Sequence, residues 1–160
     1  MVPRDGQPAH WLRFREIALL DTIENGLELK QLAELKMENA MPGKFVINLT
    51  RAKDDPDRAT VAFVVANAAV ASDKKSMVFL STEGVRLAQA GYADGIHEEG
   101  FMALKDLMAN FVNAGGEIYV CSPCFKKRKL DETNLVPGAV IVGGAKLVEF
   151  MGEGAPSVSF

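Results

Sequence analysis

The sequence predicts an α/β protein with three layers, in which helices cover both faces of a mainly parallel sheet of five strands. From about residue 42 onward, short apolar runs alternate with helical segments, which is typical of βαβ units. The chain has 160 residues, of which 48% are hydrophobic, and this suffices for one substantial core. We therefore expect one α/β domain over residues 42–160 and a separate N-terminal helical extension over residues 1–41.

Five short apolar runs are the predicted strands. Each is bounded by charged residues, glycine, serine or proline, and the last is the shortest. They are residues 45–49 in KFVINLT, 77–80 in SMVFLS, 118–121 in EIYVC, 139–142 in AVIV, and the closing SVSF.

The segment DDPDRATVAFVVANAAVAS between the first two strands predicts a helix. Asp55 can cap it, Pro56 suits its first position, and Asp57 lies near the positive end of the helix dipole. The helix is apolar almost all round, so one face of a sheet cannot cover it, and we expect further burial against another subunit.

Three more helices are predicted by spacing. Residues 9–39 carry apolar side chains at helical intervals, with a break at Asn25-Gly26, and form the extension. Residues 84–91 and 100–114 supply two helices of the domain, the second of which stops at Gly115.

Charge and hydropathy exclude several classes of protein. The formal net charge is -3 and the pI is about 5.4, so no overall basic field attracts nucleic acid or an acidic membrane surface. No apolar run reaches the roughly 20 residues that span a bilayer, and the N-terminus lacks the apolar core of a secretory signal. We therefore expect a cytoplasmic protein that contacts neither nucleic acid nor membrane.

Both cysteines of the chain, Cys121 and Cys124, lie in the segment GGEIYVCSPCFKKRKL. They follow the third predicted strand, and ligands of open parallel sheets bind at the carboxyl ends of the strands. The other residues that the strand ends offer as lining of such a site are Thr82, Glu83, Gly84, Ser122 and Gly143.

This position favours a reactive thiol. Ser122 suits a helix cap and Pro123 the first helical residue, which would place both thiols at a helix N-terminus. The dipole there, with Lys126 and Arg128 folded back, would lower a cysteine pKa and favour the nucleophilic thiolate. The structural alternative is a buried cysteine that ends a strand beside an inert one in the helix, and the KKRK run can equally be a solvated helix face.

Other chemistries lack their motifs. A zinc site usually needs four protein ligands, and only two cysteines, His97 and the distant His10 are present besides carboxylates. No GxGxxG or GxSxG motif occurs, so neither a dinucleotide cofactor nor a serine hydrolase is indicated, and we expect neither a metal nor a cofactor. His97 lies in a glycine-flanked loop, where it is either an acid or base for a nearby thiol or a surface residue.

From residue 44 to the end, the chain resembles the DsrE/DsrF-like family, which includes the sulfur-relay subunits DsrE and TusD and the YchN-like proteins. The resemblance rests on KFVINLT followed by DDPDRATVAF, on FLSTEGVRL, on NAGGEIYVCSPCFKKRKL, and on LVPGAVIVGGAKLVEFM with the closing SVSF. It implies that Cys121 occupies the place of the family's active cysteine, which ends the third core strand. Cys124 makes this chain a CxxC variant.

The resemblance implies a function and partners. Cys121 would carry sulfane sulfur as a persulfide, received from a donor protein or small sulfane-sulfur compound and passed to an acceptor protein, as in a sulfurtransferase or sulfur carrier. It also implies a homotrimer or hexamer. Two alternatives stay open, namely a CxxC dithiol/disulfide redox protein and a non-catalytic oligomeric module that binds a ligand or partner at the same edge of the sheet.

Overall fold

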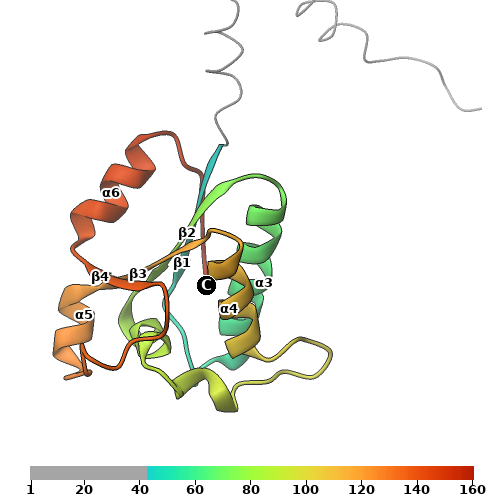
Figure 1. Ribbon diagram of the computed structural model, residues 1–160. Helices are drawn as coiled ribbons and strands as arrows, with labels where there is room; N and C mark the ends of the chain where they lie inside the picture. Colours follow the sequence, from blue (N-terminus) through green and yellow to red (C-terminus); the bar gives the residue numbers. More distant parts are fainter. Residues whose placement is uncertain (1–42) are drawn as a thin grey trace, which may run out of the picture. The chain divides into compact units, whose positions relative to one another are not determined.

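The computed structural model describes residues 43–160, which form a five-stranded sheet with helices on both faces (Figure 1). The sheet order is β4-β3-β2-β1-β5, and every neighbouring pair is parallel. The strands are β1 (Lys44–Leu49), β2 (Lys75–Leu80), β3 (Glu117–Cys121), β4 (Ala139–Val142) and β5 (Ser157–Ser159). The predicted α/β class with five strands is confirmed, whereas the predicted helical extension over residues 1–41 lies outside the described residues.

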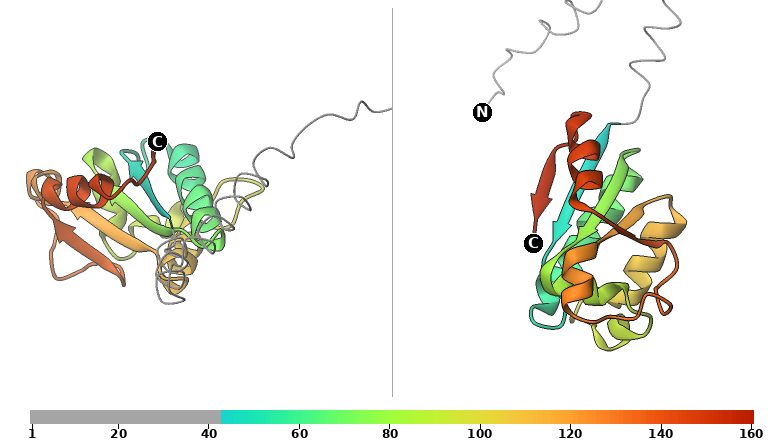
Figure 2. Two further views of the ribbon diagram at one scale, coloured as in Figure 1. Left: turned by 90° about the horizontal axis from the view of Figure 1, so that it is seen from above. Right: turned by 90° about the vertical axis from the view of Figure 1, so that its left-hand side faces the viewer.

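The helical elements connect the strands in the expected alternation. They are α3 (Pro56–Ala71), the 3-10 helices η1 (Thr82–Ala88) and η2 (Tyr92–Gly95), α4 (Leu104–Asn113), α5 (Ser122–Lys127) and α6 (Gly144–Gly152). Helices α3 and α4 cover one face of the sheet and α6 the other (Figures 1 and 2).

Helix α3 begins as its sequence predicts. The Asp55 side chain accepts a hydrogen bond from the backbone N–H of Arg58 at 3.2 Å, and Pro56 is the first helical residue. The helix buries Ala62, Phe63 and Ala66, while several of its valines are only half-buried. The expectation that these valines meet a second subunit therefore stays a prediction.

The segment between β2 and β3 differs from the prediction. Instead of one helix over residues 84–91, the chain forms η1 and η2, which are separated where Gly91 adopts a left-handed φ of 83°. The helix expected over residues 100–114 begins only at Leu104, because Gly100 has a left-handed φ of 82° and Ala103 is extended. Its predicted stop is confirmed, since Gly115 follows the helix with φ 90°.

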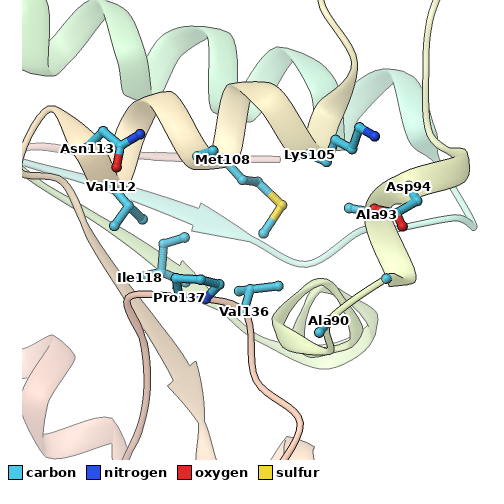
Figure 3. Close-up of a pocket in the computed structure, with 12 residues that line it drawn as sticks. Ala90, Ala93, Asp94, Lys105, Met108, Val112, Asn113, Ile118, Val136 and Pro137 are labelled. Carbon is cyan, nitrogen blue, oxygen red and sulfur yellow. The ribbon is translucent and has the colours of Figure 1, made fainter.

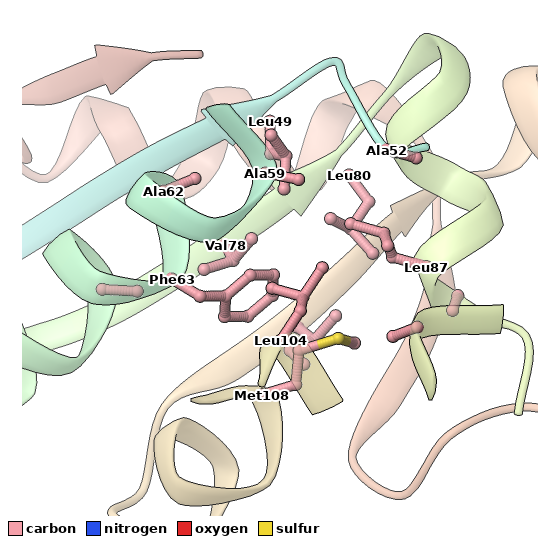
Figure 4. Close-up of a cluster of buried hydrophobic side chains, with 14 of the residues drawn as sticks. Leu49, Ala52, Ala59, Ala62, Phe63, Val78, Leu80, Leu87, Leu104 and Met108 are labelled. Atoms are coloured by element: carbon pink, nitrogen blue, oxygen red, sulfur yellow. The ribbon is translucent and has the colours of Figure 1, made fainter. Parts of the chain in front are cut away.

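Two hydrophobic clusters lie on the two faces of the sheet. The larger one joins α3 and α4 to the sheet (Figure 4). Within it, the Phe63 and Phe111 rings meet edge to face with centroids 6.0 Å apart. The smaller one packs Phe150 of α6 and the nearby Ala155 onto Val46, Met77 and Phe79. Successive side chains of a strand point to opposite faces, so β1, β2 and β3 contribute to both clusters.

Gly84 marks a close approach between η1 and the end of β1. A Cβ at this position would press into the carbonyl oxygen of Leu49 and lie 3.1 Å from its carbonyl carbon. The backbone N–H of Gly84 donates to the carbonyl of Thr50 at 3.1 Å. Glycine is therefore required here by the neighbouring main chain.

Replacing Gly84 with alanine is expected to destabilise the protein by about 1–3 kcal/mol, since the backbone of β1 cannot move aside without loss of sheet pairing. Urea unfolding followed by circular dichroism measures this. Gly144→Ala is the matched control, because no atom lies within 4 Å of a Cβ there and the position is helical. Equal stability of the two variants would contradict the close approach.

Candidate functional site

The carboxyl ends of all five parallel strands meet at one edge of the sheet. At this edge the chain leaves β1 at Thr50, β2 at Ser81, β3 directly into α5, and β4 at Gly143. The predicted position of both cysteines at this edge is therefore confirmed. Both are free thiols and both are half-buried.

Strand β3 passes into helix α5 without an intervening residue. Cys121 still pairs with Val142 of β4, and it is also the N-cap of α5, with φ -62° and ψ 108°. Ser122 is thus the first helical residue and Pro123 the second, so the expectation that Ser122 caps the helix is wrong. The sheet pairing continues one residue further than the capping pattern suggests, and this moves the helix start.

The two thiols are neighbours, but their environment is not the one that the sequence predicts. Burial raises the pKa of the Cys121 thiol above its ordinary value of 9.0, and the adjacent Cys124 side chain raises it further. The Cys124 backbone N–H and the Arg128 charge act in the opposite direction without reversing the result. The prediction of a lowered pKa at Cys121 is therefore wrong.

The pKa of Cys121 is not lowered, because helix α5 is short and most of the basic side chains do not face the thiol. Helix α5 has six residues, so its dipole is small. Lys126, Lys127 and Lys129 are exposed, and only Arg128 turns toward the site. The three lysines of the KKRK run are thus solvated, and only its arginine, Arg128, points toward the domain.

Arg128 forms the most extensive ion pair at this edge. Its Nε and Nη2 donate to Oε1 of Glu83 at 2.9 Å and 2.7 Å, and its Nη1 donates to the carbonyl oxygen of Cys124 at 3.1 Å. Oε2 of Glu83 accepts from Nε of Arg86 at 2.7 Å. The two guanidinium groups, Arg86 first and then Arg128, hold the pKa of Glu83 below its usual range.

Arg86 is the site residue that sequence reasoning missed. It lies three residues after Glu83 in STEGVRL, and this i, i+3 spacing of opposite charges was the available signal. The contact between Glu83 and Arg128 joins residues 45 positions apart, and no local pattern indicates it.

The remaining predicted residues have different places. Thr82 has a left-handed φ of 46°, and its hydroxyl donates to the carbonyl of Thr50 at 2.6 Å, so it ties η1 to β1. Gly143 caps α6 and is exposed, with no atom within 4 Å of a Cβ.

His97 is not brought to the thiols. Its side chain is exposed, and Nε2 lies 2.9 Å from the carbonyl oxygen of Phe101. The yellow loop that carries it extends beside α4, on the side away from α5 (Figure 1). The structure therefore favours the alternative that His97 is a surface residue.

A cavity of about 350 Å³ lies elsewhere, between α4, η2 and the segment before β4 (Figure 3). Its lining is largely apolar, with Met108, Val112, Ile118, Val136 and Pro137 among its members. Neither cysteine borders it, so it is separate from the thiol site.

Among residues 43–160, no group of three or more histidine, cysteine, aspartate or glutamate side chains is arranged to hold a metal ion. The same residues include no helix that is both long and apolar enough to cross a membrane.

The chain is thus an α/β protein with an all-parallel, five-stranded sheet and two free thiols where β3 ends. Residues 43–160 match the model of the DsrE/DsrF-like family. The chain belongs to this family, as its motifs predict.

Two proteins of Methanocaldococcus jannaschii are similar in sequence. MJ0760 is 30% identical over 129 residues, which are 78% of this chain and 46% of the relative, so the chain spans about half the length of MJ0760. MJ0989 is 28% identical over 117 residues, which are 73% of this chain and 99% of the relative.

Two solved structures share the fold. The ychN protein of E. coli superimposes with a TM-score of 0.55 at 11% identity, covering 73% of this chain and 99% of that protein. MTH1491 of Methanobacterium thermoautotrophicum gives a TM-score of 0.55 at 15% identity, covering 74% and 99%.

The raised pKa predicts how Cys121 reacts with iodoacetamide. Because burial disfavours the thiolate, the alkylation rate of folded Cys124→Ser protein should reach its half-maximum at a higher pH than that of the same variant unfolded in urea. Rates from pH 6 to 11 are measured by mass spectrometry. A midpoint for the folded protein at or below the unfolded one would show that burial does not control this thiol.

Proposed function

We propose that the protein is a sulfur-relay carrier that holds sulfane sulfur as a persulfide on Cys121 and transfers it to a partner thiol. The observation that carries this proposal is a free, half-buried cysteine at the carboxyl end of β3 in a chain of the DsrE/DsrF-like family. The family resemblance supplies the sulfur chemistry, and the geometry supplies the nucleophile.

Loading and discharge balance without an external oxidant. The Cys121 thiolate attacks the outer sulfur of a donor R–S–SH, the donor S–S bond breaks, and RS⁻ leaves while Cys121 becomes Cys–S–SH. An acceptor thiolate then attacks the outer sulfur of that persulfide, and the Cys121 thiolate is the leaving group. Each step transfers one sulfur atom between thiols.

The raised pKa of Cys121 suits a carrier in two ways. A thiolate of higher pKa is intrinsically more nucleophilic, although less of it is present at neutral pH. It is also a poorer leaving group, so bound sulfur is lost more slowly to adventitious thiols. Half-burial then restricts discharge to acceptors that reach the edge of the sheet.

The proposal includes partners. An anionic donor or acidic acceptor surface would meet Lys126, which is exposed on α5, whereas Arg128 is engaged by Glu83. The half-buried valines of α3 support the trimer or hexamer that the family resemblance implies, because oligomer formation would cover them.

Exposure of reduced protein to polysulfide is expected to add sulfur to Cys121. Cys121→Ser should abolish the reductant-reversible adduct. In Cys124→Ser protein the adduct should still form and should last longer than in the parent, because no second thiol can displace the sulfur. Intact-mass analysis of the three proteins, with transfer to an acceptor thiol followed in parallel, measures both effects. An undiminished adduct on Cys121→Ser protein would refute the assignment.

A second candidate is dithiol/disulfide exchange, which the position of two free thiols favours, one at the cap and one in the first turn of α5. Cys124 would attack the inner sulfur of the Cys121 persulfide, release HS⁻ and leave a Cys121–Cys124 disulfide, which two equivalents of a thiol would reduce.

If that reaction predominates, polysulfide treatment should yield protein that has lost two hydrogens, retains no extra sulfur and has released sulfide. The release should disappear in Cys124→Ser protein. Sulfide quantified beside the mass spectrum distinguishes the candidates, and a stable persulfide on the parent protein without sulfide release would remove the second one.

A further inference from the structure

The Glu83–Arg128 pair connects the segments that follow two neighbouring strands. Glu83 is in η1, which follows β2, and Arg128 is the C-cap residue of α5, which follows β3. Both carboxylate oxygens of Glu83 are occupied, one by two N–H groups of Arg128 and the other by Arg86. Such paired, charge-assisted hydrogen bonds are directional, so they orient the guanidinium group.

The same guanidinium group reaches the second cysteine through its main chain. Nη1 of Arg128 donates to the carbonyl oxygen of Cys124 at 3.1 Å, and the Arg128 side chain is only 14% exposed. Glu83 is thereby linked to the peptide at Cys124 through a single rigid group. Neither contact involves Cys121, whose main chain is held by the sheet.

Helix α5 depends on contacts of this kind. A helix of six residues has too few internal hydrogen bonds to be stable alone. Its anchors toward the rest of the domain include Phe125, which is fully buried, and the Arg128 ion pair. The ion pair therefore holds the end of α5, whereas β3 is held by its own sheet pairing.

We propose that Arg128, oriented by Glu83, is a positioning residue that sets the separation of the Cys121 and Cys124 thiols by fixing the main chain at Cys124. Its functional meaning rests on the proposed thiol chemistry, because the separation decides how readily Cys124 displaces a sulfur held on Cys121. Its chemical basis is the planar fork of arginine, which lysine cannot reproduce.

The test is the equilibrium of the protein, residues 1–160, with glutathione. Glutathione disulfide oxidises both thiols, forming the Cys121–Cys124 bond and two molecules of reduced glutathione, and the equilibrium constant is the effective concentration of the thiol pair. It is measured by mass spectrometry after acid quench for the parent, Arg128→Lys, Arg128→Gln and Glu83→Gln. Lys127→Gln, on the exposed face of α5, is the matched control.

We expect Arg128→Lys and Arg128→Gln to lower the effective concentration by about tenfold, the size that loss of a charge-assisted hydrogen bond gives. Glu83→Gln should lower it by less, because an amide keeps one acceptor, and Lys127→Gln should leave it unchanged. Restoration of the parent value by lysine at position 128, or an equal loss in the Lys127 variant, would overturn the proposal. So would parent-like values in both Arg128 variants.

Two further measurements separate this inference from the proposed function and from misfolding. Polysulfide loading of Cys121 in the parent tests the carrier function alone, and the glutathione equilibrium holds whether or not loading occurs. Circular dichroism checks that each variant is folded. If an Arg128 variant unfolds, the comparison of Glu83→Gln, the mildest change, with the parent still tests the proposal.

Discussion

The pairing of β3 with both neighbouring strands is the constraint on which the thiol site depends. The strand is hydrogen-bonded to β2 on one side and to β4 on the other, and the pairing with β4 extends to its last residue, Cys121. The two sheet faces are buried against separate clusters, and Cys121 contacts both of them. The main chain of the candidate carrier residue is therefore fixed, and only its thiol remains available for reaction.

The same constraint decides the balance of forces on the thiol. A helix N-terminus contributes about 0.3–1 kcal/mol to an exposed anion, and less when the helix has six residues. One pKa unit corresponds to about 1.4 kcal/mol, so even modest desolvation outweighs this contribution. Arg128 is too strongly engaged by Glu83 to compensate. Half-burial thus raises the pKa of Cys121, and less of the thiolate is present at neutral pH than in an exposed cysteine.

The chain at the end of β2 is shaped to support the thiol site from one side. Thr82 adopts a left-handed conformation that costs a β-branched residue on the order of 1–3 kcal/mol. Its hydroxyl bond to Thr50 and the close approach of Gly84 to Leu49 hold that conformation in place. As a result Glu83, which lies between them, is presented to α5.

The five strands, the cap of α3 and the sheet edge that carries the cysteines were all predictable from the sequence, because they follow from local periodicity and capping. It did not determine the start of α5, since Ser122 and Pro123 form a good capping pattern that the pairing of Cys121 with Val142 overrides. The direction of the Cys121 pKa depends on burial between two clusters, and the Glu83–Arg128 pair joins residues 45 positions apart. Both features arise from contacts between residues that are far apart in the sequence, so no local pattern could predict them.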